Sequence, residues 1–305
     1  MKRFFLIGMP YAWLIALFLM PFLIVLKIAL SDAGDAMPPY FPVFDPDNAW
    51  ASLKAMFRQF DFENFIWLTE DALYWRAYLS SLKIAAISTV LALLIGYPIA
   101  YAMARAPKEW QTTLLLLVIL PFWTSFLIRV YAWMSILQNN GFLNSVLDWT
   151  GLGPLLVTLG FAESFPLQIM NTPTAVYIGI VYTYLPFMIL PIYATLEKLD
   201  TSLIEAATDL GCSRASGFWR VTFPLSKSGV VAGCFLVFIP AIGEFVIPSL
   251  LGGSRTLMIG KILWEEFAKN RDWPLASAVA VVLLLLLIIP IMLFQRHQET
   301  SEGHS

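Results

Sequence analysis

Six apolar stretches, each about 20 residues long, limit what this chain can fold into more than any other feature. They lie near Phe4–Ile28, Leu79–Ala104, Thr113–Leu137, Pro173–Leu196, Ser228–Leu251 and Leu275–Phe294. A helix of this length spans the hydrocarbon core of a bilayer. The chain is 59% hydrophobic and only 13% charged, whereas soluble domains are about a quarter charged. The sequence therefore predicts an all-α integral membrane protein with six transmembrane helices.

Proline and glycine inside these stretches do not exclude helices in a membrane. The prolines include Pro121, Pro186, Pro240 and Pro248. In a helical bundle, neighbouring helices satisfy the carbonyl groups that a proline leaves without a donor. Gly229 and Gly233 open the fifth stretch, and small residues four positions apart allow two helices to approach closely.

The chain lacks the residues that several classes of function need, and those classes are therefore not predicted. The net charge of -2 gives no basic surface for binding nucleic acid. Only two cysteines are present, Cys212 and Cys234, so a disulfide framework is not predicted. The only histidines, His297 and His304, lie in the polar tail. No zinc site and no histidine-dependent hydrolase can be built from this set, and no metal ligands are predicted.

The lysines and arginines between the stretches predict the orientation, because cytoplasmic loops carry an excess of positive charge. With the N-terminus inside, the inside loops are short and basic. The segment between the third and fourth stretches, residues 138–172, contains no lysine or arginine, which is typical of an outside loop. Both termini are therefore predicted to face the cytoplasm, in a multi-pass protein of a bacterial cytoplasmic (inner) membrane.

This orientation divides the chain into parts. Residues 1–305 form one predicted transmembrane domain. Residues 31–78 form an outside segment, whose second half mixes aromatic and charged residues like an amphipathic element at a membrane surface. Residues 197–227 form an inside loop between the fourth and fifth helices, and residues 295–305 a polar inside tail.

The inside loop contains a polar segment with strong local signals. Ser202 and Glu205 have the spacing of a capping box, which predicts a short helix over residues 203–210. Gly211 follows as a residue that can adopt the left-handed conformation at a helix end. The simplest interpretation is an ordinary connecting loop with incidental caps. The alternative is a compact knob that another protein grips.

A second short helix is predicted to start at Ser213 or Ser216 and to end at Pro224. The small side chains of Ala206 and Ala207 would let a partner surface come close. Glu205 and Arg214 can pair with charges across such a contact.

The run Glu205-Ala206-Ala207-x3-Gly211-x9-Val221-x-Phe223-Pro224 resembles the EAA loop of binding-protein-dependent ABC importer permeases. Phe223 stands where the family has leucine, and the spacing is intact. In that family the knob is the coupling helix, which sits in a cleft of a separate ATPase subunit. The resemblance implies a type I ABC importer permease fold. It also assigns ATPase coupling to Glu205, Ala206, Ala207, Gly211 and Arg214.

Other stretches are similar to the polyamine branch of the family, the putrescine and spermidine permeases. These are "AAISTVLALLIGYPIAYAMA", "LPFWTSFLIRVYAWM", "GIVYTYLPFMILPIY", "GEFVIPSLLGG" and "WPLASAVA". The resemblance implies four kinds of partner: a second homologous permease forming a heterodimer, two ATPase subunits, an extracytoplasmic polyamine-binding protein and the lipid bilayer. No nucleic acid is expected.

The chain has no nucleotide site of its own. A phosphate-binding loop needs the pattern Gly-x4-Gly-Lys-Ser/Thr, and Gly260-Lys261-Ile262 lacks both the hydroxyl residue and the earlier glycine. We therefore expect a transport subunit that is not an enzyme and has no cofactor. ATP and Mg would bind at the partner ATPase.

Glu244, midway along the fifth stretch, is the main candidate for the substrate path. A carboxylate at membrane depth costs about 2.5 kcal/mol or more, so it should face a partner or a wet cavity. It could be a counter-charge for a cationic substrate, a structural partner of Arg129, or a contact to a partner subunit. Gly243, with Pro240 and Pro248 nearby, would loosen the helix there.

Aromatic residues near the same stretches are further candidates, because aromatic faces attract alkylammonium groups. They are Trp123, Tyr131, Tyr182 and Tyr184. Tryptophan and tyrosine in membrane helices are more often interfacial anchors, and this alternative stays open for each of them. Trp123 and Tyr184 lie beside Pro121 and Pro186 and are the stronger candidates.

These observations together predict the permease subunit of an ATP-driven polyamine importer. A related importer of iron, sulfate or molybdate would have the same loop and spans, and the acidic Glu244 favours the cation. An ion-coupled carrier would show inverted repeats, and none is evident. A membrane enzyme would need a nucleophile and a base, which the stretches do not supply.

Overall fold

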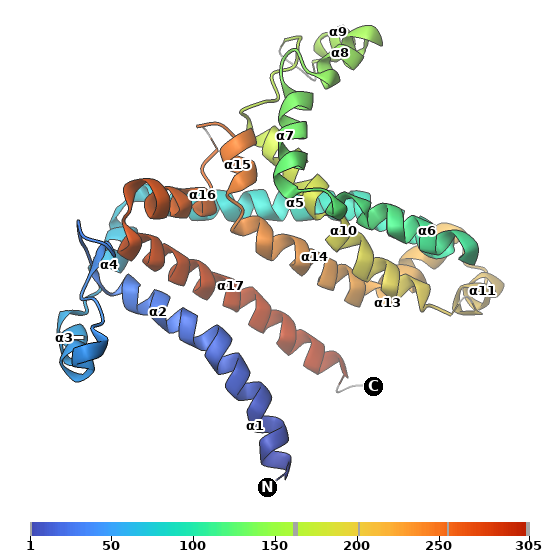
Figure 1. Ribbon diagram of the computed structural model, residues 1–305. Coiled ribbons are helices and arrows are strands. Elements are labelled where there is room, and N and C mark those ends of the chain that lie inside the picture. Colours follow the sequence, from blue (N-terminus) through green and yellow to red (C-terminus); the bar gives the residue numbers. More distant parts are fainter. Residues whose placement is uncertain (1, 161–163, 201, 255, 303–305) are drawn as a thin grey trace. The chain divides into compact units, whose positions relative to one another are not determined.

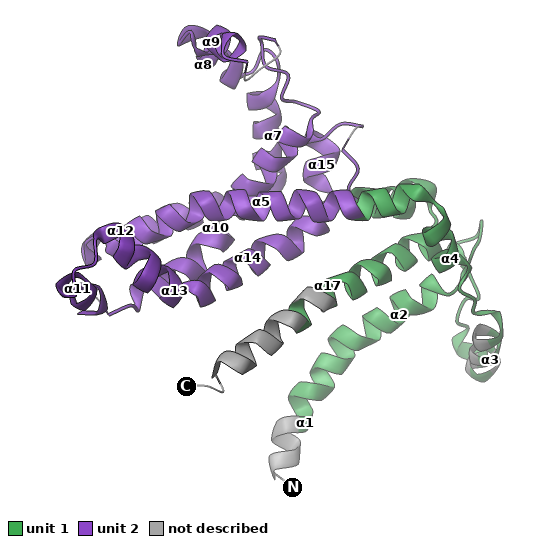
Figure 2. Cartoon of the chain, turned by 180° about the vertical axis from the view of Figure 1, so that it is seen from behind, with its two compact units in different colours: residues 1–78, 259–305 green, residues 79–258 purple. Residues whose placement is uncertain are grey.

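The computed structural model of the protein describes residues 2–160, 164–200, 202–254 and 256–302, and these are mostly helical (Figure 1). The chain divides into two compact units (Figure 2). Unit 1 contains residues 1–78 and 259–305, and unit 2 contains residues 79–258. Helix α5 (Ala72–Arg105) begins in unit 1 and continues through unit 2.

Unit 1 consists of helices from both ends of the chain and a two-stranded antiparallel ribbon. Its elements are α1 (Lys2–Leu14), the π-helical turn η1 (Ile15–Leu19), α2 (Met20–Ala29), β1 (Asp32–Ala33), β2 (Tyr40–Phe41), η2 (Pro46–Asn48), α3 (Ala49–Gln59), α4 (Glu63–Glu70), the start of α5, α16 (Ile259–Trp264), the π-helical turn η5 (Glu265–Asn270) and α17 (Trp273–Glu302). Helix α17 packs against α2 and α4, and Tyr78 on α5 donates a hydrogen bond to the carbonyl of Val279 on α17 at 2.8 Å.

Unit 2 contains the remaining helices. They are the rest of α5, α6 (Lys108–Ile119), the 3-10 turn η3 (Leu120–Trp123), α7 (Phe126–Leu137), α8 (Phe142–Trp149), α9 (Leu152–Thr158), α10 (Pro173–Glu197), α11 (Ser202–Asp209), α12 (Arg214–Gly217), the π-helical turn η4 (Phe218–Thr222), α13 (Phe223–Leu225), α14 (Lys227–Ile242) and α15 (Val246–Leu251). Helix α11 lies at one end of this unit and α8 and α9 beyond the end of α7 (Figure 1).

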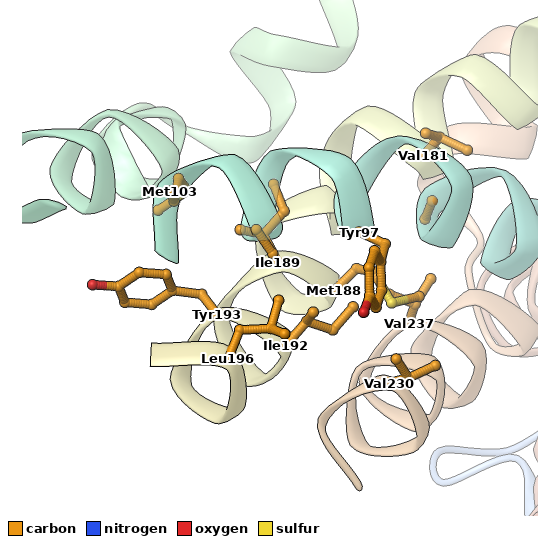
Figure 3. Close-up of a cluster of buried hydrophobic side chains, with 12 residues drawn as sticks. Tyr97, Met103, Val181, Met188, Ile189, Ile192, Tyr193, Leu196, Val230 and Val237 are labelled. Atoms are coloured by element: carbon orange, nitrogen blue, oxygen red, sulfur yellow. The ribbon is translucent and has the colours of Figure 1, made fainter. Parts of the chain in front are cut away.

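The core of unit 2 lies where α5, α10 and α14 meet. Met188 and Ile192 on α10 and Val237 on α14 are fully buried in one cluster with Tyr97 of α5 (Figure 3). Helix α14 packs closely on α10, as the two small residues at its start predict. A Cβ atom at Gly229 would lie 2.6 Å from the backbone carbonyl oxygen of Pro191 on α10, so a side chain there would push the two helices apart.

Within the described residues, three helices are long and apolar enough to cross a bilayer. They are Gly8–Ala29, Ala72–Arg105 and Pro173–Glu197. Two further spans are counted only if a pair of helices joined by a bend is taken as one span. One pair is Lys108–Trp123 with Phe126–Trp149, bent by 89°. The other is Arg214–Leu225 with Lys227–Ile242, bent by 64°. In the last expected span, the described apolar helix Trp273–Ile288 is shorter. The count of six spans stays a prediction.

Two of the expected spans are not continuous helices. The stretch Thr113–Leu137 leaves the helical conformation at Thr124 and Ser125, whose ψ angles are 152° and 137°, and α7 leads away from α6 in a new direction (Figure 1). The stretch Ser228–Leu251 is interrupted after Ile242. In the second case a proline contributes to the interruption. Pro248 has no N–H, so the carbonyl of Glu244 lacks its helical donor.

Candidate functional site

The break between α14 and α15 contains one buried acidic residue, Glu244. Gly243, Glu244 and Phe245 are not helical, and α15 starts again at Val246. The expectation that the chain loosens around Gly243 agrees with this geometry. A helix that restarts here has free backbone N–H groups in its first turn, which need acceptors.

The Glu244 carboxylate supplies these acceptors. Its Oε1 accepts hydrogen bonds from the amides of Phe245, Val246 and Ile247 at 3.1, 3.0 and 3.4 Å. Its Oε2 accepts one from the hydroxyl of Tyr184 on α10, at 2.6 Å. Only 7% of the residue is exposed. The carboxylate is therefore held by four donors, and it connects α10 to the break.

Glu244 borders a hollow of 510 Å³ in unit 2. The main side chains around it are Phe122, Phe126, Arg129, Tyr184, Phe187 and Glu244, and we call this site the aromatic hollow. The ring of Phe187 lies 5.2 Å from that of Phe122 and 6.2 Å from that of Tyr184. Aromatic faces carry negative partial charge, so a wall of this kind with a carboxylate at its edge is suited to a cation.

Arg129 contributes a positive charge to the same hollow. Its guanidinium carbon lies 5.6 Å from the ring centre of Phe122 and 6.0 Å from that of Phe126. One of its nitrogens donates to the carbonyls of Pro121 and Thr124. Among the described residues, Glu244 and Arg129 form no ion pair with each other. The structural pairing of these two residues, one of the alternatives from the sequence, is thus not the one observed.

The predicted substrate-path residues separate into two groups. Glu244, Tyr184 and Arg129 come together at the hollow. Tyr182 instead packs against the ring of Trp133, at 5.2 Å. Trp123 and Tyr131 are 76% and 53% exposed and do not line the hollow.

Sequence reasoning missed four phenylalanines that line the hollow, Phe122, Phe126, Phe187 and Phe245. A signal was present for one of them. Phe187 follows Tyr184 by three positions, so both lie on one face of a helix. Phe122 and Phe126 lie on either side of the break after η3, and Phe245 lies in the break before α15. Nothing in the local pattern placed these three beside α10.

The polar segment between α10 and α14 forms a knob of short helices, residues 202–225. Helix α11 ends in a Schellman motif, in which the amide of Cys212 donates to the carbonyl of Ala207 at 3.0 Å and that of Gly211 to Thr208 at 2.9 Å. Gly211 has a φ of +84°, the left-handed conformation expected for it. Ser213 caps α12, its hydroxyl accepting the amide of Ser216 at 3.2 Å.

The start of α11 differs from the expected capping box. Ser202 is already helical, and its amide donates to Oδ1 of Asp200 at 2.9 Å. Aspartate is as good a capping residue as serine, and here it lies two positions earlier in the chain. The donated hydrogen bond holds the pKa of the Asp200 carboxyl below its usual value, because it favours the ionised form. At the other end of the knob the helix continues one residue past Pro224, to Leu225.

The exposed side of the knob carries most of the predicted coupling residues. Glu205, Ala206, Gly211 and Arg214 are exposed, and Ala207 is buried. Helix α11 packs on α12 and η4. The knob thus offers a small, charged surface, and the packing of α11 on α12 and η4 holds this surface in place.

Aromatic rings attach the knob to α5. The ring of Phe218 in η4 lies 5.6 Å from Tyr97 and 5.8 Å from Tyr101, both on α5. The hydroxyl of Tyr97 forms a hydrogen bond of 2.9 Å with that of Ser226, at the start of α14. These contacts join the knob to α5 and to α14.

Two other hollows lie elsewhere. One of 740 Å³ in unit 2 is lined by uncharged residues, including Gln138, Asn139 and Asn171. Another of 360 Å³ in unit 1 is lined by Asp32, Glu63 and Asp272. The carboxylates of Asp32, Asp61 and Glu63 lie within 4.8 Å of one another. Exposed acidic groups commonly lie this close on solvated surfaces, so we infer no metal site from them.

Comparison with known proteins agrees with this architecture. Residues 92–301 match the family "Binding-protein-dependent transport system inner membrane component". The chain is 38% identical, over 95% of its length and 92% of the relative's, to a protein named spermidine/putrescine transport system permease protein PotB from Haemophilus influenzae. It is 41% identical to the Escherichia coli protein of the same name, over 74% of this chain and 78% of the relative.

A solved structure has a similar fold. It is that of a bacterial ABC transporter involved in the import of the acidic polysaccharide alginate, with a TM-score of 0.67 over 98% of this chain and 96% of that one. The identity is 16%, so this likeness supports the fold alone. The family match and the close relatives show that the chain belongs to the binding-protein-dependent transport system inner membrane components, the ABC transporter permeases.

Proposed function

We propose that this permease is the subunit of an ATP-driven importer that forms the membrane path for polyamines such as spermidine and putrescine. Its similar relatives in Haemophilus influenzae and Escherichia coli are spermidine/putrescine permeases by name. The observation that carries the proposal is the aromatic hollow with the buried carboxylate of Glu244 at its edge. Polyamines are alkylammonium cations, and this hollow has the chemistry that recognises them.

Each part of the hollow has a role in this function. The rings of Phe122, Tyr184 and Phe187 hold the ammonium groups, at about 0.5–2 kcal/mol for each contact. Oε2 of Glu244 accepts one hydrogen bond from Tyr184, and a carboxylate oxygen can accept two, so one position is available to a substrate ammonium. The other oxygen is committed to α15 and keeps the carboxylate in place.

The remaining parts follow from the family and the knob. The importer contains a second, similar permease, two ATPase subunits that bind ATP and Mg, and an extracytoplasmic polyamine-binding protein. The knob, within the loop 197–227, sits in the ATPase and transmits its closure through Glu205, Ala206, Ala207, Gly211 and Arg214. Their exposure supports this role for four of the five. Transport then proceeds by alternating access.

The proposed topology puts this protein in a bacterial cytoplasmic (inner) membrane. The single transmembrane domain of residues 1–305 keeps both termini, the loop 197–227 and the tail 295–305 inside, and the segment 31–78 outside. The lack of lysine and arginine in residues 138–172 supports this orientation.

The test is uptake of labelled spermidine and putrescine by the complete importer in vesicles, with wild-type protein and Glu244→Gln. Glutamine keeps the shape and an acceptor oxygen for α15 but removes the charge. We expect uptake to fall at least roughly tenfold, equivalent to the loss of about 1.5 kcal/mol when a charged hydrogen bond becomes neutral. Glu109→Gln, at an exposed position on α6, is the matched control.

Two results would contradict the proposal. Wild-type vesicles that accumulate sulfate or molybdate but no polyamine would show a related importer with another substrate. Unchanged polyamine uptake by Glu244→Gln would remove Glu244 from the path.

A further inference from the structure

The aromatic hollow already contains a cation of the protein's own. Of the described residues that line it, Arg129 is the one with a positive charge. Its guanidinium group lies over the rings of Phe122 and Phe126, at 5.6 and 6.0 Å, where an alkylammonium ion would lie. An arginine keeps its charge at every physiological pH.

Hydrogen bonds to the backbone hold this cation in the hollow. Arg129 donates to the carbonyls of Pro121 and Thr124 and, at 3.4 Å, to the hydroxyl of Thr124. These groups lie at the break between η3 and α7, where the helical hydrogen bonds are interrupted. The side chain thus has a fixed position that does not depend on Glu244.

Glu244 in turn takes its donors from α15 and from Tyr184. Two opposite charges therefore border one hollow, and among the described residues they form no ion pair with each other. A cation that enters is attracted by Glu244 and repelled by Arg129. In surroundings of low dielectric constant, both effects are much larger than in water.

We propose that Arg129 is a specificity-determining residue that competes with the substrate for the aromatic wall. This role rests on the proposed function. Transport needs a site that binds its substrate strongly enough for the substrate to enter and weakly enough for it to leave. Arg129 keeps the hollow from binding a polyamine tightly. For a small cation with one charge, the attraction to Glu244 is largely cancelled by the repulsion from Arg129, so such a cation binds weakly.

The test is the affinity of labelled spermidine for the purified importer assembled without its binding protein. Arg129→Gln keeps donors for the two carbonyls and removes the charge. We expect its Kd for spermidine to fall at least roughly tenfold, because removing one unit charge from the wall that the substrate binds, at an effective dielectric constant near 20, is worth at least the about 1.4 kcal/mol that a factor of ten requires. Arg129→Lys keeps the charge and should bind like the wild type. Arg76→Gln, at an exposed position on α5, controls for the loss of an arginine elsewhere.

A second variant isolates the charge within one folded protein. In Arg129→His the side chain is neutral near pH 8 and charged near pH 5.5, since an unperturbed histidine titrates at about 6.5. We expect its affinity for spermidine to weaken as the pH falls, by more than in the wild type. Glu244 and Tyr184 are the other titratable groups around the hollow. Any change in affinity that they cause with pH also occurs in the wild type, so the wild-type curve is the control.

The outcomes separate the two proposals. Wild-type importer that takes up no spermidine overturns the proposed function, and this inference with it. If wild-type uptake is normal but Arg129→Gln binds spermidine no more tightly, and Arg129→His follows the wild type across the pH range, then Arg129 only holds the break together. Lower thermal stability of both variants with an unchanged Kd would likewise show a purely structural role and overturn the inference.

Discussion

Replacing Gly211 by alanine should weaken the grip of the knob on its ATPase without disturbing the membrane helices. Gly211 has a φ of +84°, and a Cβ atom there would meet nothing within 4 Å. Steric contacts therefore add nothing to the free-energy cost of the substitution. The whole cost comes from placing an L-residue in the left-handed region, which is about 1–2 kcal/mol. This changes the population of the native turn by a factor of roughly 5–30.

Gly217 offers a matched control in the same knob. Its φ is -62°, a right-handed helical value, and a Cβ atom there also meets nothing within 4 Å. Alanine at this position is expected to be neutral or stabilising, because alanine favours helix over glycine by about 1 kcal/mol. Asparagine at Gly211 should lie between the wild type and alanine, since asparagine tolerates the left-handed conformation better.

The assay is purification of the tagged chain from its native membrane in mild detergent, with the bound ATPase quantified by mass spectrometry. The expected order of bound ATPase is wild type and Gly217→Ala first, then Gly211→Asn, then Gly211→Ala. Spermidine uptake should follow the same order. Equal binding by Gly211→Ala and the wild type would refute the role of the left-handed turn, and a wild type that brings down no ATPase would refute the coupling role itself.

Two further predictions concern the hydrogen bonds of two buried polar residues, Glu244 and Asn144. Tyr184→Phe removes the hydroxyl that donates to Glu244, a bond to a charged group worth about 1.5–3 kcal/mol, and should lower the thermal midpoint of the purified protein; an unchanged midpoint would contradict this. Asn144→Ala should increase hydrogen exchange in residues 138–172, because the buried Asn144 donates to three carbonyls and accepts the amide of Leu167 at 2.9 Å. The exposed Asn139→Ala should leave the exchange as it is.

Local signals in the sequence predicted the features that depend on local physics. The length and hydropathy of the apolar stretches identify helices such as Ala72–Arg105 and Pro173–Glu197. The conformation of Gly211 follows from its place after a short helix, and the close approach of α10 and α14 from the spacing of Gly229 and Gly233. In each case neighbouring residues decide the outcome.

The breaks and the hollow were harder to predict because they depend on distant residues. A hydropathy window over Thr113–Leu137 stays apolar across the bend and carries no information about it. Burial cost alone identified Glu244, but three of its four donors are backbone amides, which leave no pattern in a sequence. Phe126 and Arg129 border the same hollow as Phe122 only because the chain turns after η3.

The tight contact between α10 and α14 has a mechanical consequence. With Gly229 and Gly233 against the backbone of α10, neither helix can slide along the other without opening a void, so the two behave as one rigid lever. The helical path bends by 64° between Leu225 and Lys227, and it is interrupted at Gly243, so α14 has a change of direction at each end. These positions are the joints of the lever. One adjoins the knob and the other the aromatic hollow, so in the proposed function a rotation at the first joint would turn the lever and change the hollow at the second.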